Sequence, residues 1–387
     1  MKILVIGAGM YVTGRQGTGE GTVLAALAQA ATRMPLEPVD VIARNPANSE
    51  AVAEAVARIN RRLGGNFRAR YLAVPSVAEY LAGSGEYQAA IVSVPDHLHY
   101  DIGRAVLEKG IHCLMVKPFT PRLAEAQELL RIQRERGVYG AVEFHKRFDA
   151  SNRLVRRLMA DGTIGEARYF VINFSQRISI PLEVFREWSS QSNIFQYLGV
   201  HYVDLVYFLT GARPERVVAV GTEGVLAGWG VSAYDSVHAV IQWRGGAGGK
   251  NPFVTVMNIG WIDPRGTSAL SDQRFMLIGS AGRLEVDQKN RGIELVKEGQ
   301  GSQQLNPYFS DYLPTIDGGM EFQGYGYDSI RGFLEDVRSF QSGRIGLEEL
   351  EKTRPSFRQA LVSTAVIEAV NTSLSQSSRW VDIHDLS

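Results

Sequence analysis

Apolar and polar positions follow two different rhythms along this chain, and the change falls after Phe148. Before it, short apolar runs alternate with stretches that have the spacing of an amphipathic helix. The runs predict six strands, at residues 2–7, 39–44, 67–74, 89–94, 112–117 and 138–144. Helical patterns at 47–64 and 121–137 each end on a glycine, which suits a helix C-terminus. Repeated βαβ units of this kind predict a doubly wound parallel sheet.

After Phe148 the strands follow one another without helices between them, which favours an antiparallel sheet. We predict strands at 167–177, 213–224, 236–245, 252–262, 274–280 and 282–287, with helices at 151–162, 328–340 and 354–370. Residues 245–251 and 298–319 are interpreted as loops, the second long and rich in aromatic residues. The expected architecture is α/β, with domain 1–145 on the parallel sheet and an α+β domain 146–387 on an open, mainly antiparallel sheet.

Composition narrows the class of partner. A chain of 387 residues is long enough for two domains, and its 41 Lys and Arg balance its 41 Asp and Glu. No global field favours nucleic acid or an anionic membrane, so a small molecule is the expected partner. The single Cys113, within an apolar run, is interpreted as a core residue. We expect a cytoplasmic protein, because the N-terminal segment lacks a signal-peptide pattern and no apolar run reaches membrane-spanning length.

The first predicted strand leads directly into a glycine loop. Gly7 and Gly9 occupy the first two positions of a dinucleotide fingerprint, where a tight turn and a close approach to pyrophosphate exclude larger side chains. The third glycine is displaced, so we expect an insertion in the pyrophosphate turn before a helix begins at Thr22. This insertion holds four further glycines, namely Gly14, Gly17, Gly19 and Gly21.

The end of the second strand bears on the choice of dinucleotide. An acidic residue there would bind the ribose 2′-hydroxyl of NAD, but Ala43, Arg44 and Asn45 supply none. Arg44 could bind the 2′-phosphate of NADP, so NADP is favoured over NAD. The alternative interpretation is that Arg44 is a solvated residue at the end of a strand.

The fourth and fifth strands end in turns that should border the nicotinamide, since ligands of open parallel sheets bind at the carboxyl ends of strands. Asp96 lies in the first turn, with His99 close behind it, and contact with the cofactor is expected there. Lys117 ends the fifth strand, and Pro118 disfavours a helical conformation for it. No His or carboxylate pair has convincing metal-ligand spacing, so no metal site is predicted.

The segment YLGVHYVDL has helical periodicity and an unusual polar row. Tyr197, His201 and Asp204 share one face at i, i+4 and i+7, opposite an apolar stripe. That stripe consists of Leu198, Leu205 and Leu209.

Taken together, these motifs resemble the glucose-fructose oxidoreductase, inositol dehydrogenase and rhizopine-catabolism (Gfo/Idh/MocA) family. The carriers are IGAGM at the first strand, VPDHLH, VKP, EFHKRFD and GVHYVDLVYFLTG. The resemblance implies a Rossmann domain followed by an α+β domain whose open sheet often forms homodimers or homotetramers. It also implies NAD(P)-linked oxidation or reduction of a sugar, an inositol or a derivative.

Two departures from the family pattern concern the reacting groups. The family's EKP motif maps onto Val116, Lys117 and Pro118, so the lysine is kept but the carboxylate that could orient it is lost. In the family's DxGxH helix, His201 matches the histidine, whereas Tyr197 stands in the place of the aspartate.

A secondary alcohol that loses a hydride must also lose a proton, and this assigns roles to the candidate residues. His201 is the predicted base, Lys117 would stabilise the developing negative charge, and Tyr197 would donate to the substrate or relay the proton. Asp204 is expected to orient His201. Arg147 could bind an anionic substrate group, and the alternative interpretation is a charged residue at the end of a strand. The predicted cofactor-binding residues are Gly7, Gly9, Met10, Tyr11, Arg44, Asn45, Val94, Pro95, Asp96, His99 and Lys117, and the substrate-binding residues are Lys117, Arg147, Tyr197 and His201.

Two other functions compete with a dehydrogenase or reductase. One is an enzyme that retains its NAD and uses transient oxidation to drive an elimination, with Tyr197 as the base. The other is a non-catalytic sensor of dinucleotide or sugar, against which the retention of Lys117 and His201 argues.

Overall fold

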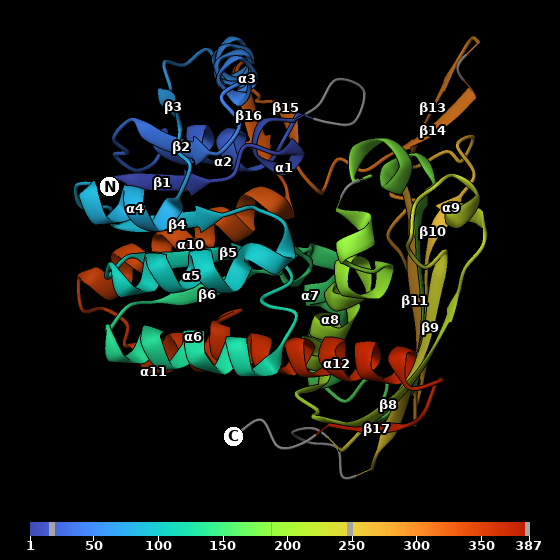
Figure 1. Ribbon diagram of the computed structural model, residues 1–387. Helices are drawn as coiled ribbons and strands as arrows, with labels where there is room; N and C mark the ends of the chain where they lie inside the picture. Colours follow the sequence, from blue (N-terminus) through green and yellow to red (C-terminus); the bar gives the residue numbers. More distant parts are fainter. Residues whose placement is uncertain (15–19, 187, 246–250, 300, 384–387) are drawn as a thin grey trace. The chain divides into compact units, whose positions relative to one another are not determined.

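The computed structural model describes residues 1–14, 20–186, 188–245, 251–299 and 301–383, and these form two compact units (Figure 1). The first unit comprises Met1–Thr120, Ala124–Asp149 and Tyr308–Ala360, and the second comprises Pro121–Leu123, Ala150–Pro307 and the chain from Leu361 onward. The sequence predicts a single second domain over residues 146–387. The structure differs, since residues 308–360 return to the first unit.

A six-stranded parallel sheet forms the centre of the first unit, and all six predicted strands are confirmed. Its strands are β1 (Ile3–Ile6), β2 (Val39–Ala43), β3 (Ala69–Ala73), β4 (Ala89–Val92), β5 (His112–Val116) and β6 (Gly140–Glu143). They lie in the order β3-β2-β1-β4-β5-β6, all parallel, so the direction of winding reverses between β1 and β4. This is the doubly wound arrangement that binds ligands at the switch point.

Helices cover both faces of this sheet (Figure 1). They are α1 (Met10–Thr13), α2 (Val23–Ala31), α3 (Asn48–Leu63), α4 (Val77–Gly83), α5 (His99–Glu108), α6 (Leu123–Glu135), α10 (Tyr325–Gln341) and α11 (Leu347–Thr353), with short turns η1 (Asp96–Leu98) and η2 (His145–Phe148). The glycines predicted to close α3 and α6 do so, because Gly64 and Gly137 both adopt positive φ. α5 packs closely on the sheet, since a Cβ on Gly103 would lie 2.9 Å from Met115 Cε.

Helix α10 explains why residues 308–360 belong to the first unit. Its apolar face is buried in the same cluster as β1 and α2, and consists of Ile330, Phe333, Leu334 and Val337. Just before it, β15 (Asp311–Pro314) and β16 (Met320–Gln323) form a hairpin, and Phe322 N donates to Gln29 Oε1 at 2.8 Å. The expected loop at 298–319 therefore contains strands. Its alternation was missed because each strand is short and pairs with one neighbouring strand only.

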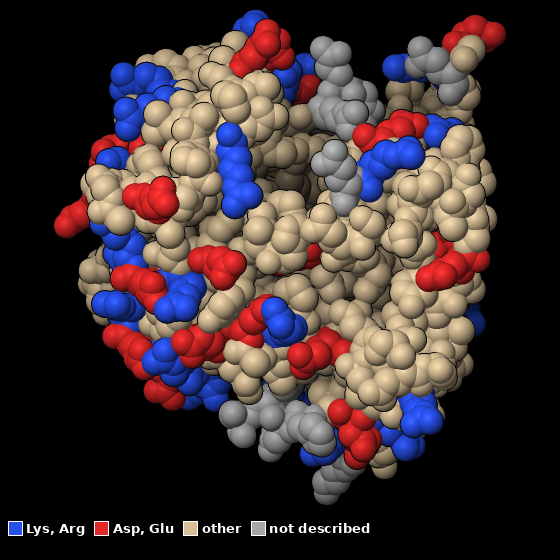
Figure 2. All heavy atoms as spheres, in the orientation of Figure 1, with Lys and Arg blue, Asp and Glu red and all other residues tan. Residues whose placement is uncertain are grey.

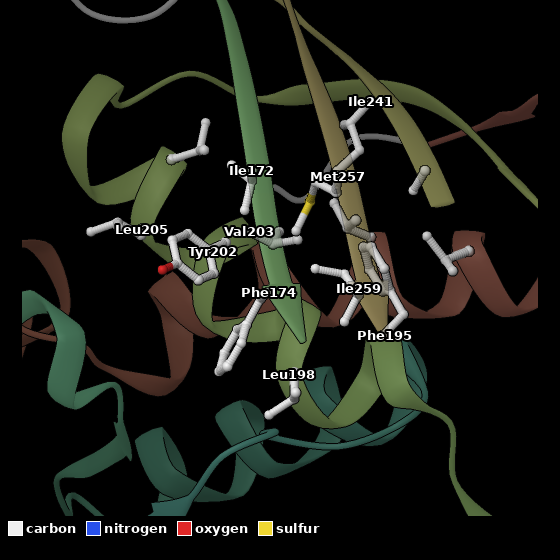
Figure 3. Packing of buried hydrophobic residues seen from close by; sticks show 14 of the residues in the cluster. Ile172, Phe174, Phe195, Leu198, Tyr202, Val203, Leu205, Ile241, Met257 and Ile259 are labelled. Carbon is white, nitrogen blue, oxygen red and sulfur yellow. The ribbon is translucent and has the colours of Figure 1, made fainter. Parts of the chain in front are cut away.

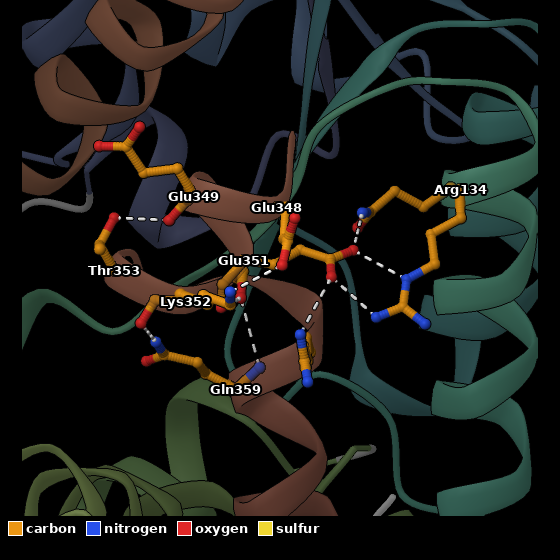
Figure 4. A network of polar contacts seen from close by, with 10 residues as sticks. Arg134, Glu348, Glu349, Glu351, Lys352, Thr353 and Gln359 are labelled. Carbon is orange, nitrogen blue, oxygen red and sulfur yellow. Dashed lines mark hydrogen bonds and ion pairs between the residues drawn. The ribbon is translucent and has the colours of Figure 1, made fainter. Parts of the chain in front are cut away.

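A buried polar network joins α6 to α11 at the periphery of the first unit (Figure 4). Glu351, only 4% exposed, accepts from Arg134 Nε at 3.0 Å, from Arg134 Nη2 at 2.7 Å and from Gln133 Nε2 at 3.1 Å. A buried carboxylate without such donors would be strongly destabilising, so the network fixes which helices meet here.

The second unit is built on a seven-stranded sheet, as expected open and mainly antiparallel. Its strands are β7 (Ala167–Arg177), β8 (Pro214–Thr222), β9 (Ser236–Trp243), β10 (Phe253–Asp263), β11 (Ser271–Gly279), β12 (Arg283–Asp287) and β17 (Val381–Asp382), in the order β12-β11-β7-β10-β9-β8-β17. Only the β7–β10 pair is parallel. Buried and less buried residues alternate along β10, so one face of the sheet carries the core.

Helical segments pack on that face. They are α7 (Ala150–Ala160), η3 (Ile180–Val184), η4 (Ser189–Gln191), η5 (Phe195–Gly199), α8 (Val200–Thr210), α9 (Val225–Gly228) and α12 (Phe357–Ser375), and a hairpin of β13 (Ile293–Lys297) and β14 (Gly301–Leu305) completes the unit. Figure 3 shows the core, in which Phe195, Leu198, Tyr202 and Val203 face Ile172, Phe174, Met257 and Ile259. The predicted loop at 245–251 falls mostly outside the described residues.

The surface carries both signs of charge. Figure 2 shows Lys and Arg interspersed with Asp and Glu over the face that it draws. No helix among the described residues is long and apolar enough to cross a bilayer. The mixed surface charge agrees with the balanced composition of the chain.

Candidate active site

The glycine turn after β1 has the two properties that a dinucleotide turn requires. Gly7 has φ 106°, and a Cβ there would lie 2.0 Å from the carbonyl oxygen of Ser93, so the fold itself demands glycine. Gly9 is exposed with φ −75°, and a Cβ there would meet nothing within 4 Å. The space beside Gly9 is therefore open, and this turn fits the close approach of a pyrophosphate.

The insertion lies one helical turn later than expected. Helix α1 follows Gly9 directly, and the inserted residues come after this helix in the sequence. The described ends of the insertion lie close together, because Thr22 N donates to Tyr11 O at 2.8 Å and a Cβ on Gly21 would lie 2.4 Å from Gly14 N. The glycine turn itself is therefore uninterrupted, and the insertion expected within it lies after α1 instead. The predicted loop glycines Gly17 and Gly19 lie outside the described residues.

The end of β2 is open and basic. Arg44 and Asn45 are both exposed, and no carboxylate occupies this short segment. The backbone is held by Tyr71, whose hydroxyl donates to Asn45 O at 2.5 Å, while Asn45 Oδ1 accepts from Ala47 N at 3.0 Å. The segment thus presents a guanidinium to solvent on a fixed turn.

His99 connects the turns that follow β4 and β5. Its Nδ1 lies 2.7 Å from Pro118 O and its Nε2 lies 3.0 Å from Val94 O, and its side chain is 1% exposed. Burial lowers the pKa of this imidazole, against the charge of the neighbouring Asp96. The His99 ring therefore contacts backbone carbonyl oxygens of both turns. Its contact with a cofactor stays a prediction. In the same turn Val94 is half-buried and Pro95 is exposed.

Lys117 directly follows β5 and is half-buried, and its peptide bond to Pro118 is cis. Burial lowers the pKa of the Lys117 amine to about 7, while the charges of Glu143 and Asp96 act in the opposite direction. An amine in this range exists in both protonation states near neutral pH, which suits a group that handles a proton.

Glu143 is a functional candidate that the sequence analysis did not assign. It ends β6, is 1% exposed, and accepts from Ser329 Oγ at 2.5 Å. His145 Nδ1 lies 3.0 Å from its other carboxylate oxygen, and the buried hydroxyl of Tyr11 lies beside it. Burial, and then the charge of Glu143, raise the pKa of the Tyr11 phenol, which stays protonated. The available signal was position, because Glu143 ends the strand next to that of Lys117.

Arg147 is placed inside the first unit. It is 6% exposed, donates to Gln359 Oε1, and its guanidinium carbon lies 5.7 Å from the centre of the Phe144 ring. These contacts account for its burial, and its predicted role in binding an anionic substrate stays a prediction.

The helix expected to carry Tyr197, His201 and Asp204 is not one continuous α-helix. Residues Phe195–Gly199 form a π-helical turn, closed by the bond from Val200 N to Phe195 O, and α8 begins only afterwards. The wider turn changes the angular spacing between Tyr197 and His201, and the shared face expected for their side chains stays a prediction. Gly199 fits this turn, since a Cβ there would lie 2.9 Å from the Phe195 ring.

Tyr197 lies among aromatic side chains of the second unit. Its ring centre is 5.4 Å from that of Phe185, 5.1 Å from that of Trp188 and 5.8 Å from that of Trp261. Burial raises the pKa of the Tyr197 phenol to about 12, although a hydrogen bond with Gln176 opposes the shift. At neutral pH this phenol is a hydrogen-bond donor rather than a base.

His201 and Asp204 are buried in α8, at 5% and 2% exposure. The His201 ring centre lies 6.3 Å from that of Phe174. The predicted apolar stripe is confirmed, since Leu198, Leu205 and Leu209 are all buried. The neighbouring residues of α8 are buried as well, so His201 and Asp204 are polar side chains within a core helix. Buried polar groups of this kind are typically functional or structurally essential.

Cys113 is fully buried in β5, and burial raises the pKa of its thiol, which confirms its interpretation as a core residue. Within the described ranges, no three His, Cys, Asp or Glu side chains are grouped so that they could hold a metal ion.

Comparison with known proteins finds a family match in each half of the chain. Residues 1–144 match the family described as "Oxidoreductase family, NAD-binding Rossmann fold" (GFO_IDH_MocA), and residues 152–285 match the "GFO/IDH/MocA C-terminal domain".

Among curated relatives, UDP-N-acetylglucosamine 3-dehydrogenase of Acidithiobacillus ferrooxidans is 30% identical over 178 residues, which are 46% of this chain and 49% of that protein. The match thus spans about half of that relative. Inositol 2-dehydrogenase of Rhizobium meliloti is 23% identical over 336 residues, 82% of this chain and 92% of that protein.

A solved scyllo-inositol dehydrogenase from Lactobacillus casei, with bound NAD(H) and scyllo-inositol, superposes with a TM-score of 0.66 at 15% identity. The superposition covers 99% of this chain and 98% of that one. At this identity the likeness shows the fold.

Proposed function

Since this chain belongs to the Gfo/Idh/MocA family of oxidoreductases, we propose that it is a dehydrogenase or reductase acting on an inositol, a sugar or a sugar derivative. The observation that carries the proposal is the carboxyl edge of the parallel sheet, where the open turn at Gly9 and the half-buried Lys117 follow β1 and β5. Relatives that act on an inositol and on a nucleotide sugar support the substrate class.

The residues present fit a nicotinamide dinucleotide. Gly7 and Gly9 would hold its pyrophosphate, Arg44 and Asn45 its adenosine end, and the turn at Asp96 its nicotinamide end. Met10, Tyr11, Val94, Pro95 and His99 border these positions. When bound, the nicotinamide supplies or accepts the hydride.

The side chains of the protein would manage the proton. His201 accepts it from the substrate hydroxyl, and Lys117 donates a hydrogen bond that stabilises negative charge on the oxygen. Tyr197, with its pKa raised to about 12, remains protonated and donates to the substrate. Arg147 is proposed to bind an anionic substituent where the substrate has one.

A substrate panel tests the activity. The purified protein is incubated with NAD⁺ or NADP⁺ and with inositols, sugars and nucleotide sugars, and the nicotinamide absorbance is followed. Lys117→Ala and His201→Ala should each lower kcat/KM by roughly 100-fold or more, while Lys352→Ala on the surface of α11 should leave it unchanged. Unchanged kcat/KM in both site variants would exclude the roles assigned to them.

We further propose that NADP binds more tightly than NAD, because the exposed Arg44 stands where an acidic residue would select NAD. Arg44→Ala should weaken NADPH binding roughly tenfold in a fluorescence titration, the loss of one charged hydrogen bond. NADH binding should change little, and Arg33→Ala serves as the control. Tighter binding of NADH than NADPH by the unmodified protein would contradict this preference.

The two competing functions receive no support from the named relatives. The elimination hypothesis needs Tyr197 as a base, and its pKa of about 12 disfavours this at neutral pH. Turnover without net change of NAD(P)H would revive the elimination, and binding without turnover would favour a sensor. We also propose that the protein acts in the cytoplasm and assembles as a homodimer or homotetramer through its antiparallel sheet, where Tyr169 and Val220 are exposed.

A further inference from the structure

The position of the missing carboxylate is known from the strand register. The family's EKP glutamate maps onto Val116, and Val116 pairs directly with Glu143 across the parallel strands β5 and β6. Paired residues on neighbouring strands direct their side chains to the same face of a sheet, and such strands lie about 4.8 Å apart. A carboxylate at either position therefore starts from the same side of the sheet, either on the residue before Lys117 or on the β6 residue paired with it.

The Glu143 carboxylate is held in place by partners from several elements. Ser329 on α10 donates to one oxygen at 2.5 Å, and His145 Nδ1 lies 3.0 Å from the other. The His145 ring is itself packed against Phe309 and Tyr325, with ring centres 5.2 Å and 5.5 Å away. A carboxylate that is 1% exposed needs such support, and its orientation is correspondingly restricted.

Two charged groups of the first unit act on the Lys117 amine from neighbouring elements. Asp96 faces it from η1 and Glu143 from β6. Glu143 in turn faces Tyr11 from α1, His145 from η2 and Ser329 from α10. Asp96 Oδ1 is engaged by His97 N at 3.0 Å in its own turn. Glu143 is thus the carboxylate anchored on the strand adjacent to Lys117.

We propose that Glu143 is the positioning residue for Lys117, supplying from β6 the carboxylate that the family's motif carries at the position of Val116. This inference rests on the proposed function for its catalytic meaning. Held by Ser329 and His145, the carboxylate favours the charged form of the Lys117 amine and orients it. The alternative, a purely structural anchor between β6 and α10, predicts no effect on Lys117.

Removing the charge gives the direct test. Glu143→Gln keeps the shape and an acceptor for Ser329, and Glu128→Gln on α6, where the side chain is 34% exposed, is the matched control. The reactivity of Lys117 toward trace acetic anhydride is measured from about pH 5 to about pH 10 by peptide mass spectrometry. Loss of a nearby opposite charge should move the Lys117 inflection to lower pH by roughly one unit, whereas the control should not move it.

A transplanted carboxylate provides the rescue. The double variant Val116→Glu with Glu143→Gln should return the Lys117 inflection toward its original pH and restore at least half of any lost kcat, with KM little changed. If Glu143→Gln fails to fold, Ser329→Ala keeps the charge but loosens it, and a smaller shift in the same direction is expected.

The proposal is overturned if the Lys117 inflection in Glu143→Gln lies at the same pH as in the unmodified protein. If Glu143→Gln does not fold, an unchanged inflection in Ser329→Ala has the same meaning. The labelling needs neither substrate nor turnover. A shifted inflection in a protein without dehydrogenase activity would therefore refute the proposed function and leave the link between Glu143 and Lys117 standing.

Discussion

Two glycines in the turn after β1 differ in what a side chain would meet. At Gly7 the backbone is left-handed and a Cβ would collide with the carbonyl oxygen of Ser93, whereas at Gly9 the backbone is ordinary and the space is open. The sequence motif treats them alike. Only the structure separates a glycine required by the turn from one that leaves room for a ligand.

This difference predicts opposite phenotypes for two alanine variants. Gly7→Ala should lower the free energy of unfolding by roughly 2–4 kcal/mol through strain and collision. Gly9→Ala should change it by less than roughly 0.5 kcal/mol but weaken NAD(P)H binding at least tenfold, about 1.4 kcal/mol. Denaturant unfolding and fluorescence titration measure the two effects. A Gly9→Ala protein that binds the dinucleotide normally would show that the open space is not the pyrophosphate site.

Tyr197 occupies the position of the family's aspartate, and its protonation state decides what it can do. With a pKa of about 12, its phenol donates throughout the neutral range. Tyr197→Phe should therefore lower kcat/KM by roughly tenfold, the value of one lost hydrogen bond, and leave the shape of the pH profile unchanged.

The measurement is kcat/KM against pH, with Tyr207→Phe on α8 as control. A loss of roughly 100-fold or more with a new pH dependence would instead identify Tyr197 as an acid–base group.

At the scale of single elements, β2 illustrates how a buried charge can support a sheet. Asp40 is 1% exposed, and it accepts from Arg70 on β3 and from Tyr87, whose hydroxyl lies 2.6 Å away. Burial alone would raise the pKa of this carboxyl, but the hydrogen bonds from Arg70 and Tyr87 prevail and lower it below the ordinary value of 3.8.

The lowered pKa predicts how stability depends on pH. A group whose pKa is depressed by folding stabilises the protein above its unfolded pKa, and that contribution disappears as the pH falls through the folded pKa. Asp40→Asn should accordingly lower the Tm at pH 7, and the difference from the unmodified protein should shrink as the pH falls below about 3.8. Thermal unfolding at several pH values measures this. An equal difference at both ends of the range would contradict the linkage.

The segment from Phe195 to Thr210 shows what an element-level prediction can miss. Its helical character, its apolar stripe and its polar residues followed from local periodicity. The π-turn did not follow from periodicity. The wider turn occurs where Gly199 lies against the Phe195 ring, and no periodic pattern records such a packing relation.

At the scale of the whole molecule, the first unit needs two distant parts of the chain. Residues 1–149 provide the sheet, but α10 covers part of it with Ile330, Phe333, Leu334 and Val337. Loss of these four buried side chains would cost roughly 2–5 kcal/mol of stability each. The total cost exceeds the free energy of unfolding of a typical domain.

Fragments of the chain can test whether the first unit needs residues 308–360. Residues 1–149 alone should bind hydrophobic dyes and unfold without a cooperative transition, whereas the same fragment joined by a flexible linker to residues 308–360 should unfold cooperatively. Near-ultraviolet circular dichroism during heating distinguishes them. Cooperative unfolding of 1–149 alone, with a Tm equal to that of the linked form, would show that the C-terminal segment is dispensable for this unit.

The sequence by itself determined the kinds of most elements in the two main sheets and the helices beside them. Six parallel strands, the alternating strands after residue 148, the glycine-capped helices and the residues at strand ends all follow from patterns that repeat over a few positions. Such patterns report which face of an element is apolar.

Only the tertiary structure decided which distant residues meet. The return of 308–360 to the first unit, the pairing of Val116 with Glu143, and the anchoring of that carboxylate by Ser329 join positions far apart in the chain. These relations depend on strand order, register and the packing of α10, which are set by the complementarity of whole surfaces and not by local periodicity.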